Sequence, residues 1–274
     1  MEQRPRQFLN AGVAEQNLTG VAVGMALSGK IVFTYSVANF PTLRCLEQIR
    51  NDVCYHDANV KVVCVGGGLC YGALSHSHHA TEDLAVTRAM PGLLVVAPGD
   101  PVETRAATRA VAAHPGPCYL RLGKAGEPLV HPGEIDFQLG RAIRFREGSD
   151  VTLISTGGML HTATRAAEQL ERLGIQARVL SMHTLKPLDV EAVLEAATQT
   201  PLIATVEEHS ILGGLGTAVA EVLAEAAGPL APLKRFGLPA EFSPHIGSQE
   251  YMRAQHGLTP DAVAGAIEGL LQSR

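Results

Sequence analysis

A lone carboxylate, Glu15, lies near the start of a helix-like segment of small and apolar residues that extends from Asn10 to Gly29. A carboxylate in such surroundings is either paired and ionised or retains a proton. Both states suit general acid–base chemistry at a bound molecule. The simpler alternative is a first-turn glutamate that is stabilised by the helix dipole. We expect burial of the apolar residues Val13, Leu18, Val21, Ala22, Met25 and Ala26.

Three histidines within four residues, His76, His78 and His79, form a second chemical cluster. They follow a Gly-Gly-Gly sequence that begins at Gly66, and such a sequence allows a tight turn and close approach of a ligand. Imidazole can bind zinc or nickel, and it also moves protons near neutral pH. Because no cysteine or second histidine pair lies at ligand spacing, we do not favour a metal site here and expect no metal ligands in this chain.

One aromatic and one basic residue complete the candidates. Phe40 follows a strand-like run and could stack on a flat heterocycle, or it could be an ordinary core aromatic. Arg121 lies near the end of another strand-like run, where sites collect in α/β proteins. Its guanidinium could bind a phosphate, or it could pair with a surface carboxylate.

The elements that must position these residues alternate between strand and helix, which predicts an α/β fold with two doubly wound, mostly parallel sheets. In the first half, the strands and helices are expected at Lys30–Tyr35, Leu43–Asn51, Val60–Val65, Glu82–Arg88, Leu93–Ala97, Pro101–Ala113 and Cys118–Leu122. In the second half, they are expected at Val151–Ser155, Leu160–Leu173, Gln176–Ser181, Asp189–Ala197, Leu202–Val206, Gly214–Ala226, Pro232–Phe236 and Pro260–Leu271.

The alternation of strands and helices is interrupted from Gly123 to Ile143, where Gly, Pro and scattered charged residues replace the periodic apolar residues. We therefore expect a first domain over residues 1–124, a linker over 125–142 and a second domain over 143–274.

Composition limits the partners and the location. The 274 residues are 46% apolar and 18% charged, with a formal net charge of −5, which gives no reason to expect nucleic acid or an anionic membrane. The five cysteines form no C-x-x-C pair, and neither a secretory signal nor a long apolar run is visible. These features favour the cytoplasm.

The segment Gly12-Val-Ala-Glu15-Gln-Asn17 resembles the Gly-Ile-Ala-Glu-Gln-Asn signature of the thiamine-diphosphate-dependent transketolase family. The resemblance implies that Glu15 bonds the N1′ nitrogen of the aminopyrimidine and helps to turn the cofactor into a carbon nucleophile. The segment Arg44-x-x-Glu-Gln-Ile-Arg50-Asn is similar to split transketolases. The implied organisation is a pyrimidine-binding domain followed by the family's C-terminal domain.

The same resemblance assigns further residues to the site. Phe40 takes the second aromatic position that stacks on the pyrimidine, whereas Val37 occupies the first. Tyr35 and Arg44 would be neighbours at the cofactor. Arg121 would bind the substrate phosphate.

The histidine loop departs from the family pattern. In the alignment with sugar transketolases, His78 is the active-site histidine, and Ala73-Leu74 replaces an acidic pair that recognises the donor. The string Gly72-Ala-Leu-Ser-His76-Ser also resembles the β subunits of 2-oxoacid dehydrogenase E1 enzymes, in which His76 would be the important histidine. His79 is a third candidate to face the substrate.

The segment Glu207-Glu208-His209, with the glycines that follow it, resembles a signature of the family's C-terminal domain. A glycine-rich loop at a helix start could hold phosphate, but the spacing is not that of a P-loop. We favour a packing or subunit-contact role.

The family's diphosphate-binding first domain, with its Gly-Asp-Gly motif, is absent from the sequence. The resemblance thus implies one subunit of a split transketolase that transfers a two-carbon ketol unit. A separate subunit would hold the diphosphate and Mg²⁺, in a homodimer of heterodimers. The alternatives are a 2-oxoacid-decarboxylating E1β-like or carboligase subunit and a non-catalytic regulatory partner.

Overall fold

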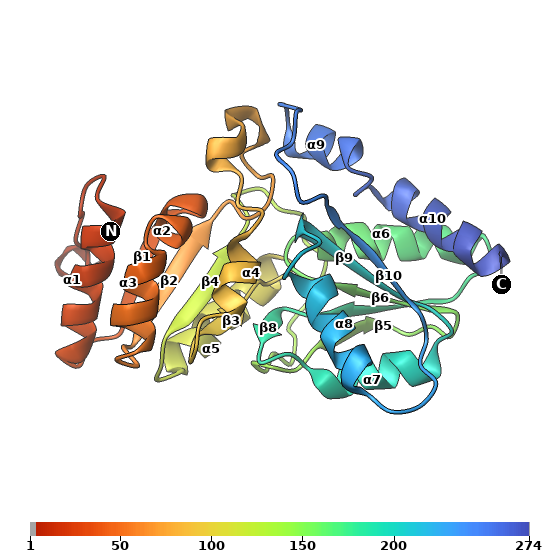
Figure 1. Ribbon diagram of the computed structural model, residues 1–274, viewed down its shortest axis with the longest axis horizontal. Helices are drawn as coiled ribbons and strands as arrows, with labels where there is room; N and C mark the ends of the chain where they lie inside the picture. The colour runs from red at the N-terminus through yellow and green to blue at the C-terminus, as the bar shows by residue number, and fades with distance from the viewer. Residues whose placement is uncertain (1–3, 274) are drawn as a thin grey trace.

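The computed structural model describes residues 4–273, and it contains two five-stranded sheets that lie side by side (Figure 1). The first sheet has the strand order β1-β2-β4-β3-β8. Its strands are β1 (Val32–Val37), β2 (Val60–Val65), β3 (Leu94–Val96), β4 (Cys118–Leu122) and β8 (Thr184–Lys186). Strands β1 to β4 run parallel, whereas β8 pairs antiparallel with β3. Strand β8 comes from the second half of the chain, so both halves contribute to the first sheet.

The second sheet has the order β10-β9-β6-β7-β5 and is parallel except for its edge strand β5. Its strands are β5 (Ile143–Arg146), β6 (Val151–Ser155), β7 (Ala177–Ser181), β9 (Ile203–Ser210) and β10 (Leu233–Leu238). Strands β6, β7 and β9 are buried throughout, as expected for strands that are covered on both faces.

Helices cover the sheets on both faces. Those of the first half are η1 (Pro5–Gln7), α1 (Glu15–Leu27), α2 (Asn39–Leu43), α3 (Leu46–Gln48), η2 (Ile49–Cys54), η3 (Gly72–Leu74), η4 (His76–His78), α4 (Asp83–Arg88) and α5 (Pro101–Ala113). Those of the second half are α6 (Met159–Arg172), α7 (Val190–Gln199), α8 (Leu215–Glu225), α9 (Gln249–Gln255) and α10 (Pro260–Gln272).

One apolar core passes from the first sheet to the second. It joins Val62 of β2 and Val95 of β3 to Leu185 of β8, and continues to Ile154 and Ile203 beneath the second sheet. The opposite faces have separate cores, one under α5 and one under α6 and α10. The two halves are therefore packed as one body on the side that carries α4 and α8.

The predicted α/β class is confirmed, and β2, β4, β6 and α5 have the predicted bounds. Strands β5 and β8 and helices α2 and α9 were not predicted, and neither were the short turns η1, η3 and η4. Strand β8 is only three residues long, and its partner β3 is distant in the sequence. Strand β5 directly follows residues 123–142, which form neither helix nor strand.

The expectation of a largely buried first helix is wrong in part. Helix α1 begins at Glu15 and buries Ala22 and Ala26, but Val21 is exposed and Val13, which precedes the helix, is 94% exposed. The small residues of α1 pack on the first sheet, and the opposite side of the helix has no covering element among residues 4–273.

No helix within residues 4–273 combines the length and the apolar character that a membrane span requires.

Candidate active site

Glu15 is the first residue of α1, and it is only 7% exposed although it lies at the end of a partly exposed helix. Arg44 Nη1 donates to Glu15 Oε2 at 2.8 Å, and Thr19 Oγ1 donates to the Glu15 carbonyl at 2.9 Å. Burial raises the pKa of Glu15, but hydrogen bonds and the charge of Arg44 outweigh it, so the pKa is lowered overall. Glu15 is therefore ionised at neutral pH.

Phe40 on α2 extends this ion pair toward the histidine loop. The guanidinium carbon of Arg44 lies 4.7 Å from the centroid of the Phe40 ring, which is a cation–π contact. The His78 ring meets Phe40 edge-on, with 5.2 Å between centroids. Three successive contacts thus link Glu15 to Arg44, Arg44 to Phe40 and Phe40 to His78. These residues come from three separate segments of the chain.

Two short helical turns, η3 and η4, form the histidine loop. Ser75 between them has a φ of +65°, an uncommon backbone conformation for a residue other than glycine. Asn39 Nδ2 donates to the Ser77 carbonyl at 2.9 Å and ties the loop to α2. The Ser77 hydroxyl lies 3.0 Å from His78 Nδ1 and can orient the ring. The sequence analysis did not single out Asn39, which is next to Phe40.

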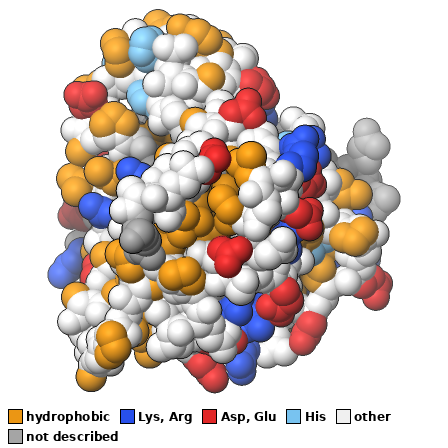
Figure 2. Space-filling view, turned by 90° about the vertical axis from the view of Figure 1, so that its right-hand side faces the viewer, with side chains coloured by type: hydrophobic (Ala, Val, Ile, Leu, Met, Phe, Trp, Pro, Cys, Tyr) orange, Lys and Arg blue, Asp and Glu red, His pale blue; other side chains and the backbone are white. Residues whose placement is uncertain are grey.

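The three histidines face different surroundings. His78 faces Phe40, whereas the His76 ring lies 5.7 Å from that of Phe242 in the second half of the chain. His76 and His79 line a cavity of about 180 Å³, but the His79 side chain is buried and burial lowers its pKa. Figure 1 draws this loop at the top of the molecule, next to the segment that leads into α9. Figure 2 views the molecule from the side where the chain ends and shows histidine side chains near the top of that face.

The three glycines before the loop are required by packing. A Cβ on Gly67 would lie 2.7 Å from Arg121 Nε, and one on Gly68 would lie 2.7 Å from Glu208 Cγ. Gly68 also has a φ of +68°, which favours glycine. The predicted tight turn is present, and the side chains of Tyr71, Arg121 and Glu208 fill the space around it.

The structure surrounds Arg121 with protein groups. The side chain is buried, and its Nε donates to Asp83 Oδ2 at 2.8 Å. Its Nη2 donates to the carbonyls of Ala80 and Glu208 at 2.9 and 3.0 Å. Tyr119 donates to the same Asp83 oxygen at 2.7 Å. Sequence reasoning missed Asp83 and Tyr119, because both contacts join residues that are far apart in the chain.

Tyr35 is the candidate that the structure leaves apart from the others. It lies on the edge strand β1 and is 68% exposed. Among the described residues, no group of three or more His, Cys, Asp or Glu side chains is placed so that it could hold a metal ion.

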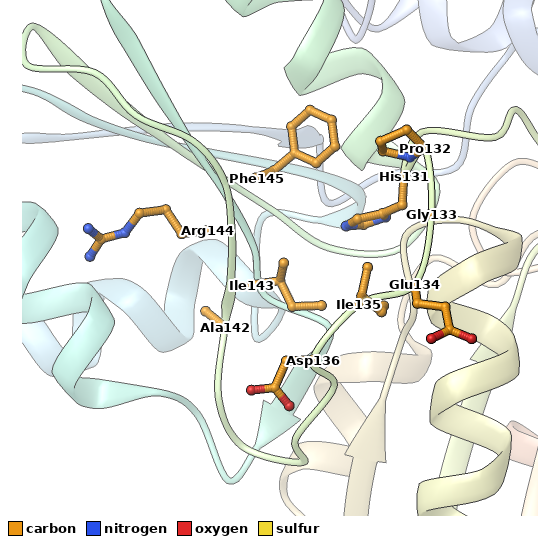
Figure 3. A pocket seen from close by; sticks show the side chains of 10 residues that line it. All are labelled: His131, Pro132, Gly133, Glu134, Ile135, Asp136, Ala142, Ile143, Arg144 and Phe145. Atoms are coloured by element: carbon orange, nitrogen blue, oxygen red, sulfur yellow. The ribbon is translucent and has the colours of Figure 1, made fainter.

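A cavity of about 590 Å³ lies elsewhere, between residues 131–136 and β5. Figure 3 shows the rings of His131 and Phe145 and the side chains of Ile135 and Ile143 turned toward one another, whereas Arg144 points away. None of the predicted site residues lines this cavity. The candidate site is instead the exposed edge that α1, α2 and the histidine loop form together.

Comparison with known families accounts for this arrangement. The family model described as "Transketolase, pyrimidine binding domain" matches residues 1–126, and "Transketolase, C-terminal domain" matches residues 140–263. The chain belongs to the transketolase family. The first match covers α1, α2 and the histidine loop, and the second covers most of the second sheet.

Two similar transketolase proteins are named as subunits. One is a subunit of the apulose-4-phosphate transketolase of Phocaeicola vulgatus, which is 41% identical over 96% of this chain and 83% of its own length. The other is the SqwH subunit of the 6-deoxy-6-sulfo-D-fructose transketolase of a Clostridium species, which is 39% identical over 100% of this chain and 84% of its own length. Their names give different substrates.

A longer relative and a solved structure extend the comparison. The "1-deoxy-D-xylulose-5-phosphate synthase" of Heliobacterium modesticaldum is 35% identical over 95% of this chain, which spans only 40% of that protein. The solved structure "Split gene transketolase, inactive beta4 tetramer" is 41% identical, has a TM-score of 0.88, and matches 99% of this chain and 86% of its own. The high TM-score supports the same transketolase fold in both.

Proposed function

We propose that this chain is one subunit of a split, thiamine-diphosphate-dependent transketolase. It would transfer a two-carbon ketol unit from a ketose or ketose phosphate to an aldehyde. The observation that carries the proposal is the continuous contact from Glu15 through Arg44 and Phe40 to His78. These residue types and their order fit the resemblance to the transketolase signature, and they lie at an exposed edge that a second subunit can cover.

The residues at this edge fit the aminopyrimidine half of thiamine diphosphate. Glu15 can share a proton with a ring nitrogen through Oε1, because Arg44 occupies Oε2. The half-buried ring of Phe40 offers a flat apolar face. We assign the diphosphate and Mg²⁺ to the partner subunit.

When bound, thiamine diphosphate supplies the carbon nucleophile that breaks and re-forms a carbon–carbon bond. Glu15 would hold a proton at the pyrimidine ring, and Arg44 would keep the carboxylate ionised and aligned. His78 would exchange a proton with a substrate oxygen through Nε2, because the Ser77 hydroxyl lies at Nδ1. The Phe40 ring, which lies between Arg44 and His78, would exclude water from the space between these two side chains.

The other predicted contacts remain predictions. The His76 ring packs against Phe242, so His76 would contact a substrate only if the substrate lay next to Phe242. The His79 side chain is buried. Arg121 would need to reach an anion while its guanidinium bonds Asp83 and two carbonyls. We therefore rank His78 first among these side chains, and we propose Tyr35 as a residue that contacts the cofactor through the partner interface.

Exposed apolar residues support a partner at this edge. Ile31, Phe33 and Tyr35 are exposed in and just before the edge strand β1, and no residue lies within 4 Å of a Cβ placed on Gly20 or Gly24 of α1. An unpaired strand edge beside a bare apolar face is typical of a surface that pairs with another chain. We propose that the diphosphate-binding subunit covers it, in a homodimer of heterodimers.

We further propose that the chain acts in the cytoplasm. We also propose that residues 125–142 link a first domain, residues 1–124, to a second domain, residues 143–274. Its five cysteines are all unpaired thiols, as suits a reducing compartment. The irregular residues 123–142 lie between the last strand of the first half and β5.

A 2-oxoacid-decarboxylating or carboligase subunit is the second candidate. It is favoured by Ala73 and Leu74, which are both exposed where sugar transketolases would carry an acidic pair. A pocket without those acceptors loses hydrogen bonds to donor hydroxyls. The similar synthase also supports this alternative.

The test is to co-express the chain with its diphosphate-binding partner and to titrate thiamine diphosphate and Mg²⁺ by calorimetry, with the isolated chain as control. We expect binding by the complex only. Ketol transfer from ketose phosphates and CO₂ release from pyruvate are then compared. CO₂ release without ketol transfer supports the second candidate, and binding in neither sample supports a non-catalytic partner.

A further inference from the structure

Glu208, on β9 in the second half of the chain, contacts the base of the histidine loop. Its Oε1 accepts a hydrogen bond from the backbone N–H of Leu69 at 2.6 Å. Two residues along, the backbone N–H of Ser210 donates to the Thr81 carbonyl at 2.8 Å. Strand β9 therefore holds the loop at both of its ends.

The loop is also closed on itself at this base. Gly68 and Ala80 exchange two backbone hydrogen bonds of 2.8 and 2.9 Å, so the residues between them form one closed unit. A side chain on Gly68 would collide with Glu208, and this close packing leaves the loop little freedom to shift relative to β9. The position of Glu208 thus fixes the position of the loop.

Helix α9 holds the Glu208 carboxylate from the other side. Arg253 Nε donates to Glu208 Oε2 at 2.7 Å, and Arg253 Nη2 contacts the same oxygen. Gln249 Nε2 donates to both carboxylate oxygens, at 3.0 and 3.1 Å. A buried carboxylate with this many donors has a single arrangement, because moving it would leave several donors unpaired.

Resting on the proposed function, we infer that Glu208 and Arg253 are positioning residues for catalysis: through Leu69 they fix the histidine loop so that His78 faces Phe40. Glu208 and Arg253 both lie in the second half of the chain, whereas the loop that carries His78 lies in the first. The pair gives the C-terminal domain a direct role at the site. A displacement of about 1 Å at a reacting group can cost roughly 100-fold in rate.

Glu207 provides a matched control on the same strand. It is also a buried glutamate, but its oxygens accept from the backbone N–H groups of Leu215 and Gly216 at the start of α8. Glu208→Gln and Glu207→Gln therefore make the same chemical change at adjacent buried positions. Only the first alters the contact to the histidine loop.

The experiment compares both variants with the wild-type complex in steady-state kinetics, thiamine diphosphate titration and hydrogen exchange of residues 66–79. We expect Glu208→Gln to lower kcat roughly 10- to 100-fold with unchanged cofactor affinity and faster exchange in the loop. We expect Glu207→Gln to keep both kcat and loop exchange. Equal kinetic and exchange effects of the two variants would overturn the inference.

A second pair covers the case in which Glu208→Gln does not fold. Arg253→Lys keeps a charged donor near Glu208, whereas Arg253→Met removes it, and the side chain is partly accessible. We expect Arg253→Lys to retain most of the activity that Arg253→Met loses. Equal losses would contradict the inference. If the wild-type complex shows no ketol transfer, the proposed function is wrong, and loop exchange alone then decides whether Glu208 positions the loop.

Discussion

The carboxylates of Glu15 and Glu208 lie in contrasting surroundings, although both are buried and both pair with an arginine. Glu15 has one ion-pair partner, Arg44, and the strand and helix around it present exposed apolar residues. Glu208 is bonded by Leu69, Gln249 and Arg253, and the chain itself encloses it. The first arrangement still has room for a ligand and a partner, whereas the second is complete.

This difference separates two uses of the same functional group. A carboxylate that exchanges a proton with a ligand needs an open side, and one that positions a loop needs every side occupied. We therefore expect changes at Glu15 to affect activity more than stability. Changes in the buried network should affect stability first, or activity through geometry.

Glu15→Gln should give the largest effect on the reaction. The amide keeps the shape but cannot hold the proton, so we expect kcat of the complex to fall by roughly 10²- to 10⁴-fold with little change in Tm. Glu47→Gln, at an exposed glutamate of α3, is the control and should keep full activity. A fully active Glu15→Gln variant would show that Glu15 exchanges no proton with the ligand, and the contrast between Glu15 and Glu208 would then be wrong.

Asp83→Asn should give the largest effect on stability. It leaves the buried Arg121 guanidinium without its counter-charge, so we expect a loss of about 3–5 kcal/mol in the free energy of unfolding. Denaturant titration measures it. Glu168→Gln, which breaks the exposed pair with Arg165, should cost about 0–1 kcal/mol. Similar losses for the two variants would mean that the Asp83 network is not enclosed as described.

The pH dependence of stability tests the buried β9 segment. Burial raises the pKa of Glu207 to about 7, against hydrogen bonds from Gly216 and Leu215 that lower it. A raised folded-state pKa means that the folded state holds the proton more tightly. The stabilisation from this group is therefore complete below pH 4.5 and is lost as the pH rises to 7.

Glu207→Gln should remove that loss. Relative to wild type, we expect the variant to gain on the order of 3 kcal/mol between pH 4.5 and pH 8, measured as the difference between denaturant curves at each pH. Using the difference cancels the opposite trend from His183, whose pKa burial lowers to about 4. A difference that stays constant with pH would mean that Glu207 is ionised in the folded chain.

Phe40→Leu should have the smallest effect of these substitutions. It tests whether the cofactor binds beside Phe40 and His78 or beside Phe242 and His76. Loss of ring stacking should weaken thiamine diphosphate binding to the complex roughly 2- to 12-fold by calorimetry. Phe242→Leu changes the ring that faces His76 and should leave this affinity unchanged. The reverse pattern would move the site toward His76.

The site could be predicted where its residues carry a local signal. Glu15 opens a helix, and Phe40 and Arg44 lie four residues apart on one segment, so their association follows from short-range pattern. The contact of His78 with Phe40 agrees with the resemblance, but it depends on how the loop folds. The exposed side of α1 was missed, because small apolar residues do not reveal which side faces a sheet.

Long-range contacts were beyond the sequence pattern. Arg121 meets Asp83 across 38 residues, and Glu208 meets Leu69 across 139. Neither distance leaves a periodic signal. Helix α9 had a signal in the sequence, because Ser248 is a typical N-cap residue and its side chain accepts from the N–H of Tyr251. The helix has only seven residues, which is too short for a clear helical period.

Strand β8 determines where this polypeptide could be cut. A break within residues 125–142 would place β3 and its antiparallel neighbour β8 on different molecules, and would divide the apolar core that Leu185 and Val95 share. The N-terminal fragment would then expose the edge of β3, which invites aggregation. The irregular stretch between the two sheets is thus a poor place for a gene to be divided, and separate expression of the two halves should yield insoluble fragments rather than independent domains.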